Sequence, residues 1–230
     1  MSSRQAAPLN ILYLDNHLIA VAKPAGLLTQ SGHQDAPSLL EMTREWIRKK
    51  YDKPGNVYLG LIHRLDRNVA GLVLFARTSK AAGRLSKQFR ERAVQKYYRA
   101  AVEGTPENKQ GALIHYLRKE KSLKTTVFPR PAPGAKKAEM VYKVAESSET
   151  TSILEIELKT GRFHQIRAQL SFLGHPVIGD VKYGASAALP GKQIALYASR
   201  LVFRHPVSGE ETCVECPPPE RWSNYAVGNF

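Results

Sequence analysis

The chain has 230 residues, with 34 lysines and arginines against 20 aspartates and glutamates, and a formal net charge of +14. This length can bury a substantial core, and the excess of positive charge predicts long-range attraction to a polyanion, with nucleic acid as the first candidate. No stretch is apolar enough to cross a bilayer, and the first residues lack a signal-peptide pattern. We therefore expect a cytoplasmic protein and not a membrane protein.

The first predicted elements are two short strands and a helix. Residues 11–26 read as a pair of strands followed by a loop, because their apolar segments end at a Pro-Ala-Gly break. A helix is expected over residues 38–50, where Ser38 and Glu41 have capping-box spacing and apolar residues recur near one face. Two interpretations remain open for its basic residues, contact with phosphates or simple solvation: Arg44, Arg48, Lys49 and Lys50.

The middle and end of the chain are rich in strand-like segments. Strands are expected at residues 58–62 and 71–76, and a second basic helix at residues 78–92. Five further strands are expected at residues 96–104, 111–117, 123–128, 138–147 and 151–160. A helix over residues 164–174 and a hairpin over residues 193–216 complete the pattern.

Many short strands interrupted by a few helices predict an α+β fold with a mixed, mainly antiparallel sheet and flanking helices. We expect a flexible tail at residues 1–9 and one catalytic domain over residues 10–230. Neither a metal nor a nucleotide cofactor is expected. The pair Cys213 and Cys216 stands alone, and residues 184–192 lack the spacing of a phosphate-binding loop.

One connection between two predicted strands places a carboxylate among cations. Asp66 lies there together with His63, Arg64 and Arg67. A loop held by flanking strands is a common place to present a reactive group, which makes Asp66 the central candidate. A structural ion-pair network would explain the same residues equally well when this motif is considered in isolation.

Two further clusters carry candidate residues. Adjacent residues of a strand face opposite sides, so only one of Tyr97 and Tyr98 can enter a given pocket. The other cluster lies at a strand-to-helix junction, where an arginine could reach a carboxylate. Its members are Arg162, His164, Gln165 and Arg167.

Four ordered elements of the chain resemble the RluA-type pseudouridine synthase family. They are HRLDRNVAGLVLFART, KYYRA, GRFHQIRAQL and GHPVIGDVKYG, and the early KPAG fits as well. The resemblance extends from about residue 10 to the final hairpin. It implies the pseudouridine synthase catalytic fold and an isomerase that converts specific uridines of structured RNA, tRNA or rRNA, to pseudouridine. It also implies flipping of the target base and no cofactor, and we expect a monomer whose partner is RNA.

The resemblance assigns roles residue by residue. It makes Asp66 the catalytic aspartate, Tyr98 the aromatic residue of the pocket and Arg167 the basic partner of Asp66. A guanidinium can donate two parallel hydrogen bonds to a carboxylate, keeping it ionised and oriented, and this is the geometry expected for Arg167 and Asp66. Substrate contacts are expected from His63, Arg64, Arg67, Arg162, His164 and Gln165.

The chain departs from the family pattern at four positions. Val69 and Ala70 stand where many relatives carry Thr and Ser, Phe163 where Thr is common, and Gln169 where His is common. These departures bear on substrate preference. The alternative function is a non-catalytic RNA-binding or RNA-chaperone protein that retains the fold. A metal-dependent nuclease is disfavoured because the chain shows no cluster of further carboxylates near Asp66.

Overall fold

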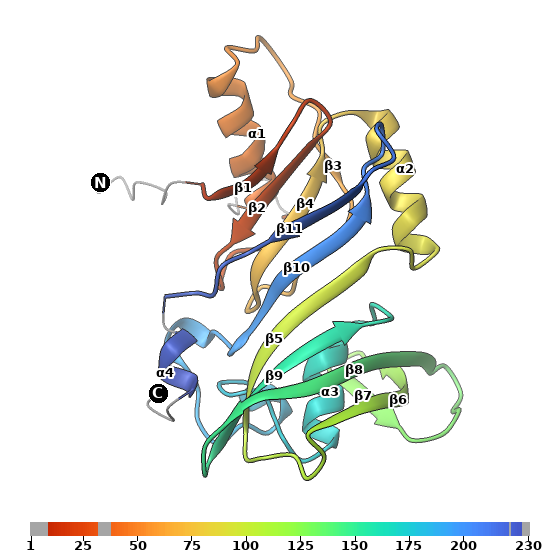
Figure 1. The fold of residues 1–230 in the computed structure, drawn as a ribbon, viewed down its shortest axis with the longest axis vertical. Coiled ribbons are helices and arrows are strands. Elements are labelled where there is room, and N and C mark those ends of the chain that lie inside the picture. The colour runs from red at the N-terminus through yellow and green to blue at the C-terminus, as the bar shows by residue number, and fades with distance from the viewer. Residues whose placement is uncertain (1–8, 32–37, 221, 227–230) are drawn as a thin grey trace.

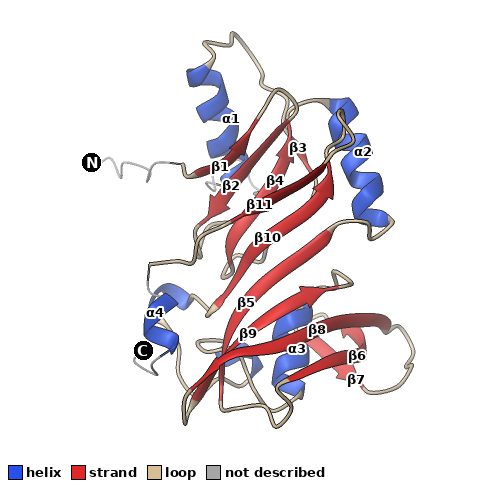
Figure 2. Cartoon of the chain, viewed as in Figure 1, coloured by secondary structure: helices blue, strands red, loops and turns tan. Residues whose placement is uncertain are grey.

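The computed structural model describes residues 9–31, 38–220 and 222–226, so almost all of the tail expected at residues 1–9 lies outside the described residues. The predicted α+β class is confirmed: one mixed, mainly antiparallel sheet of 11 strands runs through the molecule, and helices pack against it (Figure 1). Figure 2 shows how much of the chain is strand. None of the helices in the described part has the length and apolar character that crossing a bilayer requires.

The element bounds follow the expected order. The strands are β1 (Ile11–Leu14), β2 (Leu18–Lys23), β3 (Gly60–Leu61), β4 (Ala70–Ala76), β5 (Gln95–Glu103), β6 (Gln110–Lys119), β7 (Thr125–Phe128), β8 (Lys136–Ser147), β9 (Thr151–Leu158), β10 (Leu196–Arg204) and β11 (Glu211–Glu215). The helices are α1 (Leu39–Lys50), α2 (Ser79–Arg90), α3 (Gln165–Phe172) and α4 (Trp222–Ala226), with short 3-10 turns η1 (Val181–Tyr183) and η2 (Pro190–Lys192).

The sheet order is β1-β2-β4-β10-β5-β9-β8-β6-β7, with β11 also paired to β10 and β3 to β4. Only the pair of β4 and β10 is parallel among the described strands, through Ala70 opposite Tyr197 and Gly71 opposite Ala198. This short parallel contact joins the two halves of the sheet at the beginning of β4. Beyond it, β10 pairs with β11.

Side-chain alternation in β2 and β4 places α1 and α2 on opposite faces of this half of the sheet. Ile19 and Val73 belong to the cluster that contains Ile47 of α1, whereas Leu74 belongs to the cluster that contains Leu85 of α2. Successive strand residues point to opposite faces, so one helix covers each. Every residue of β4 is buried as a result, which explains its continuous apolar run.

Local signals define the starts of these helices. The side chain of Ser38 accepts a hydrogen bond from the backbone N–H of Glu41, and Thr78 caps α2 in the same way through Ala81. Such caps satisfy N–H groups that a helix leaves unpaired. The strand expected at residues 58–62 is shorter than predicted, because only Gly60 and Leu61 pair with β4 before the chain leaves the sheet.

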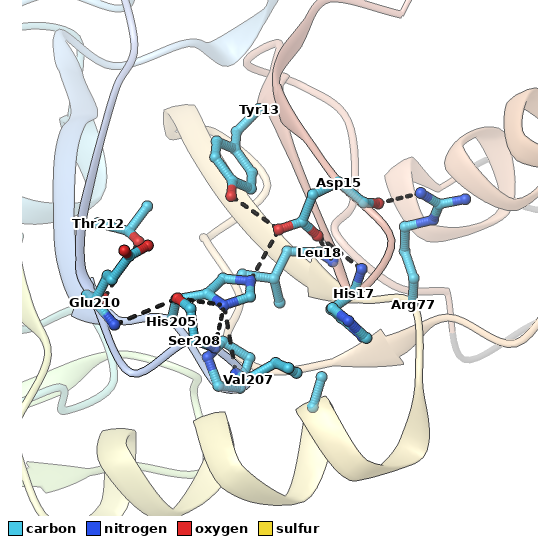
Figure 3. A network of polar contacts seen from close by, with 12 residues as sticks. Tyr13, Asp15, His17, Leu18, Arg77, His205, Val207, Ser208, Glu210 and Thr212 are labelled. Carbon is cyan, nitrogen blue, oxygen red and sulfur yellow. Dashed lines mark hydrogen bonds and ion pairs between the residues drawn. The ribbon is translucent and has the colours of Figure 1, made fainter.

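A polar network joins the turn between β1 and β2 to the end of β10 (Figure 3). The carboxylate of Asp15 accepts hydrogen bonds from the backbone N–H groups of His17 and Leu18, at 2.7 and 2.6 Å, and from the hydroxyl of Tyr13, at 2.8 Å. It also contacts Nε2 of His205 at 2.8 Å. Burial opposes the ionised form, but these donors outweigh it and lower the pKa of Asp15.

Candidate active site

Asp66 lies in the loop of residues 62–69 that connects β3 to β4, and hydrogen bonds hold this loop on both sides of the aspartate. Before it, Thr29 donates its hydroxyl to the carbonyl of Leu65 at 3.0 Å and accepts the N–H of Leu65 at 3.2 Å. After it, the carbonyl of Arg67 accepts hydrogen bonds from Lys23 Nζ at 3.1 Å and from the N–H of Gly26 at 2.8 Å. The backbone position of Asp66 is therefore fixed by residues from the beginning of the chain.

Lys23 is a buried cation that fastens this loop. It is 1 % exposed, and its Nζ donates to the carbonyl oxygens of Pro24 at 3.0 Å and Leu27 at 2.8 Å in addition to that of Arg67. Burial lowers the pKa of Lys23 to about 7, while the charge of Asp66 opposes this shift. Three carbonyl acceptors match the three N–H groups of an ammonium, so Lys23 joins two loops while it is charged.

Arg167 on α3 contacts two carboxylates at once. Its Nη1 donates to Asp66 Oδ2 at 3.1 Å, whereas its Nε and Nη2 donate to the two oxygens of Asp180 at 2.6 and 2.8 Å. Arg167 and Asp180 are 4 % and 2 % exposed. The expected contact of Arg167 with Asp66 is present, but the expectation of two parallel hydrogen bonds to Asp66 is wrong. The paired geometry belongs to Asp180, because that carboxylate lies beside the guanidinium edge formed by Nε and Nη2.

This arrangement leaves one oxygen of Asp66 without a hydrogen-bond partner in the part of the chain that the structure describes. Oδ2 receives the hydrogen bond from Arg167, while Oδ1 receives none from any described residue, and the side chain is 29 % exposed. Burial disfavours the charge of Arg167, but its hydrogen bonds and attraction to the two carboxylates outweigh this and raise its pKa. The site thus presents an accessible carboxylate oxygen beside a permanently charged guanidinium.

His164 also lies beside the Oδ2 oxygen of Asp66 that Arg167 contacts. Its backbone is left-handed (φ 52°) at the start of α3, and its Nε2 lies 3.5 Å from Asp66 Oδ2. Burial lowers the pKa of His164 to about 4, with Asp66 opposing the shift, so the ring is neutral near pH 7. The hydroxyl of Tyr183 accepts the N–H of Thr125 at 2.8 Å and lies 2.9 Å from His164 Nδ1. Tyr183 can therefore donate its proton to Nδ1, which leaves the N–H of Nε2 directed at Asp66.

Tyr98 comes from β5 and lies on the opposite face of that strand from Tyr97. Its ring is half-buried against the core, and its hydroxyl makes no hydrogen bond with a described residue. Burial and the charge of Asp66 both raise the pKa of Tyr98. Tyr98 therefore keeps its proton at neutral pH and presents an aromatic face together with an unpaired hydroxyl.

Two of the residues expected to contact substrate have structural partners. His63 Nε2 accepts the N–H of Leu74 at 3.0 Å, and burial lowers the pKa of His63 to about 4. Gln165 is 3 % exposed, and its Oε1 accepts hydrogen bonds from Thr160 and from the backbone N–H of Arg162. Gln165 therefore holds the turn before α3, and its amide is directed inward.

The three arginines expected to contact substrate differ in their surroundings. Arg64 is exposed and makes no ion pair in the described part of the chain. The Nε of Arg67 donates to the carbonyl of Gly26 at 2.9 Å, so this side chain helps to hold the loop. The Nε of Arg162 donates to the carbonyl of Lys137 at 3.0 Å.

Sequence reasoning missed three residues of the site, which are Lys23, Asp180 and Tyr183. Each lies in a motif that carries the family resemblance, KPAG in the first case and GHPVIGDVKYG in the others. The signal that could have identified each of them as a site residue was a polar side chain at a fixed place in such a motif. Its partner became visible only in the structure, since Asp180 meets Arg167 from 13 residues away.

The four departures from the family pattern lie in or beside the core. Val69 and Ala70 are 3 % and 8 % exposed, which explains apolar residues at these positions. The ring of Phe163 stacks on that of His164, with centroids 3.8 Å apart. Gln169 is fully buried, and its Nε2 lies 3.1 Å from the carbonyl of Leu113.

Candidate metal ligands do not gather at this site. Among the residues that the structure describes, no three His, Cys, Asp or Glu side chains are grouped so that they could hold a metal ion. Cys213 and Cys216 are both free thiols, one exposed and one buried.

The sequence matches the family described as RNA pseudouridylate synthase over residues 17–172. It is 32% identical to the dual-specificity RNA pseudouridine synthase RluA of Pasteurella multocida, over 91% of this chain and 93% of that protein. It is 30% identical to the ribosomal large subunit pseudouridine synthase D of Zymomonas mobilis, over 94% of this chain and 71% of that protein. The structure of human RNA Pseudouridylate Synthase Domain Containing 4 has a TM-score of 0.80 at 23% identity, covering 96% of this chain and 92% of that one, a likeness of fold.

Proposed function

Since this chain belongs to the RNA pseudouridylate synthase family and is an isomerase that acts on RNA, we propose that it isomerises specific uridines of ribosomal or transfer RNA with Asp66 as the catalytic carboxylate. The observation that carries the proposal is that Oδ1 of Asp66 receives no hydrogen bond from the described residues, while Arg167 holds the neighbouring oxygen. A carboxylate that is accessible and oriented is what this reaction needs from the protein.

The reaction breaks the N1–C1′ bond of uridine, turns the uracil over and forms a C5–C1′ bond. C5 loses its proton and N1 gains one, so atoms and electrons balance without a co-reactant. Asp66 can attack C1′ while the bond to N1 breaks, and C5 later displaces the carboxylate. In the alternative route Asp66 removes the proton from C2′ while the N1–C1′ bond breaks, which forms a glycal, and C2′ takes the proton back when C5 bonds to C1′. Both routes require the same accessible Oδ1.

Tyr98 is assigned to the uracil base in this proposal. Its ring offers a stacking surface, and its unpaired hydroxyl can donate a hydrogen bond to the base as it turns. Its raised pKa favours the neutral hydroxyl over the tyrosinate, which supports a donor and packing role rather than that of a strong base.

The target uridine must leave the RNA stack to reach Asp66. Extrusion of a base costs a few kcal/mol, which phosphate contacts and stacking on aromatic side chains offset. Two relatives of this chain are named a ribosomal large subunit pseudouridine synthase and a dual-specificity RNA pseudouridine synthase. We therefore include both ribosomal and transfer RNA among the substrates of this chain.

We expect Asp66→Asn and Asp66→Ala to abolish pseudouridine formation while RNA affinity stays within several-fold of wild type, because affinity comes mainly from phosphate contacts. The measurement is pseudouridine mapping in ribosomal and transfer RNA incubated with each purified variant, with RNA binding measured in parallel. Turnover by either variant, once deamidation of the Asn is excluded, would remove Asp66 from the catalytic role. Tight binding by a wild-type protein that modifies none of these RNAs would instead favour the RNA-binding or chaperone alternative.

A further inference from the structure

A basic groove lies next to Tyr98, outside the immediate contacts of Asp66. Its volume is about 620 Å³, and it lies between β3, the end of α2, the start of β5 and the turn after β9. Tyr98 lines the groove, so the groove adjoins the site proposed for the target uracil. Its five cationic side chains are Arg64, Arg90, Arg92, Lys96 and Arg162.

No carboxylate of the described residues neutralises the charges of this groove. None of the described residues that line it is an aspartate or glutamate, and Arg64, Arg90, Arg92 and Lys96 form no ion pair within the described ranges. Burial together with repulsion from Arg92 lowers the pKa of Lys96, which shows that like charges are held close together here. Such a cluster costs free energy unless an anion occupies it.

The hollow beside α1 provides a comparison within the same molecule. It has a volume of about 770 Å³ and contains two arginines, but two glutamates of the same helix lie beside them. Arg44 lies 3.6 Å from Glu41, and Arg48 lies 2.9 Å from Glu45. The charge of α1 is thus balanced locally, whereas the charge of the groove beside Tyr98 is not.

The walls of the groove also suit a nucleic acid strand. The ring of Phe89 lines it and stacks on His63, with centroids 5.1 Å apart and planes 16° apart. His63 is neutral near pH 7, because burial and the charge of Lys96 lower its pKa to about 4. Single-stranded nucleic acids bind where cations follow the phosphates and aromatic faces lie beside the bases.

We propose that this groove binds the phosphates of the RNA strand next to the target uridine, with Arg90, Arg92 and Lys96 as the main contacts. This proposal rests on the proposed function, because it assumes that the target uracil lies at Tyr98 and that the RNA strand continues from there into the groove. Arg90 and Arg92 position the strand and take no part in the chemical step.

The test variant is Arg90→Gln combined with Arg92→Asn. Gln retains a good helix former at the end of α2, and Asn tolerates the left-handed backbone of Arg92 (φ 59°). The matched control is Arg44→Gln combined with Arg48→Gln on α1. Melting temperatures of both variants establish that they are folded.

Binding is measured with a fluorescently labelled RNA hairpin that has a uridine-rich loop, over a series of salt concentrations. We expect the groove variant to lose about tenfold or more in affinity. The slope of log affinity against log salt should become shallower by about 0.7 for each phosphate contact removed. In turnover assays its KM should rise while kcat at saturating RNA stays near the wild-type value. The α1 control should match wild type in all these quantities.

Two outcomes would overturn the proposal. The first is a groove variant that binds RNA with the affinity and salt slope of wild type. The second is a groove variant that no longer binds inorganic phosphate but keeps its RNA affinity, which would make the groove a small-anion site. An inactive wild-type protein would contradict the proposed function alone, because the binding comparison does not depend on turnover.

Photo-crosslinking of 4-thiouridine in the hairpin loop gives an independent measurement of where the RNA lies. We expect crosslinks on the peptide that spans Phe89 and Lys96, and crosslinks confined to α1 would contradict the groove.

Discussion

At the scale of single residues, the site depends on how one guanidinium divides its hydrogen bonds. Arg167 gives two N–H groups to the buried Asp180 and one to the accessible Asp66. Asp180 therefore fixes the plane of the guanidinium, and the guanidinium in turn fixes Asp66. A buried charge that loses its partner is strongly destabilising, so the two contacts of Arg167 have different consequences when it is replaced.

We predict that Arg167→Met abolishes activity and also lowers the free energy of unfolding by about 3–5 kcal/mol, because it leaves the Asp180 carboxylate buried without a cation. The double variant Arg167→Met, Asp180→Asn removes both charges and should recover part of the stability but none of the activity. Urea unfolding and single-turnover assays on the two variants separate these effects. If Arg167→Met alone has the same free energy of unfolding as wild type, the buried Asp180 carboxylate does not need Arg167 as its counter-charge.

Two histidines make the stability of the fold dependent on pH. Burial lowers the pKa of His63 and His164 to about 4, against an ordinary value of about 6.5. Between these values the unfolded chain binds more protons than the folded chain, so stability falls as the pH drops from about 6.5 toward 4. We predict that His164→Asn, which tolerates the left-handed backbone, flattens this dependence. Urea unfolding across this pH range is the measurement, and an unchanged slope would contradict the shift at His164.

At the scale of elements, the junction of β4 with β10 governs the placement of the Asp66 loop, which leads directly into β4. Gly71 has φ +111°, and a Cβ there would lie 2.3 and 2.4 Å from the backbone oxygen and nitrogen of Ala198. The parallel pairing of the two strands includes this position. A side chain at Gly71 would therefore push apart the only parallel pair among the described strands.

We predict that Gly71→Ala lowers the free energy of unfolding by about 3–5 kcal/mol, through steric overlap together with the strain of a positive φ at a residue with a side chain. The fraction that still folds should lose activity, because the Asp66 loop shifts. Gly83→Ala is the matched control. Gly83 lies within α2, is exposed and has open space at its Cβ position, so this change should stabilise the protein by up to about 1 kcal/mol. Thermal melts compare the two, and equal melting temperatures would mean that β4 and β10 adjust without cost.

At the scale of the whole molecule, the net charge of +14 acts through the cations that no carboxylate neutralises. The ion pairs of α1 reduce its contribution, while the groove beside Tyr98 retains its charge. Attraction at long range guides RNA to the protein, and contacts at short range determine how strongly salt weakens the complex.

We predict that RNA binding weakens steeply with salt, with a slope of log affinity against log salt of about −0.7 for each phosphate contacted on a single strand. Reversal of charge at Arg44 and Arg48 should leave this slope nearly unchanged, because those residues are already paired on α1. Fluorescence anisotropy over a range of potassium chloride concentrations provides the slope. A flat response would contradict the expectation that a polyanion is bound through phosphates.

The sequence by itself determined the features that depend on neighbours along the chain. Ser38 and Thr78 start helices because their side chains reach N–H groups three residues ahead, and such caps form wherever the local pattern occurs. The succession of many short strands interrupted by a few helices predicted the mainly antiparallel sheet. Asp66 stood out because it lies among cations in the connection between two predicted strands.

The tertiary structure decided which distant residues share a contact. Asp66 and Arg167 are 101 residues apart, and only folding showed that Arg167 gives its paired hydrogen bonds to Asp180 and a single one to Asp66. Folding also turned Gln165 inward, where its Nε2 donates to the carbonyl of Glu139, 26 residues away. Hydrogen bonds are short and directional, so their partners depend on how α3 packs against the sheet and on which strands are neighbours within it, and no local pattern records either.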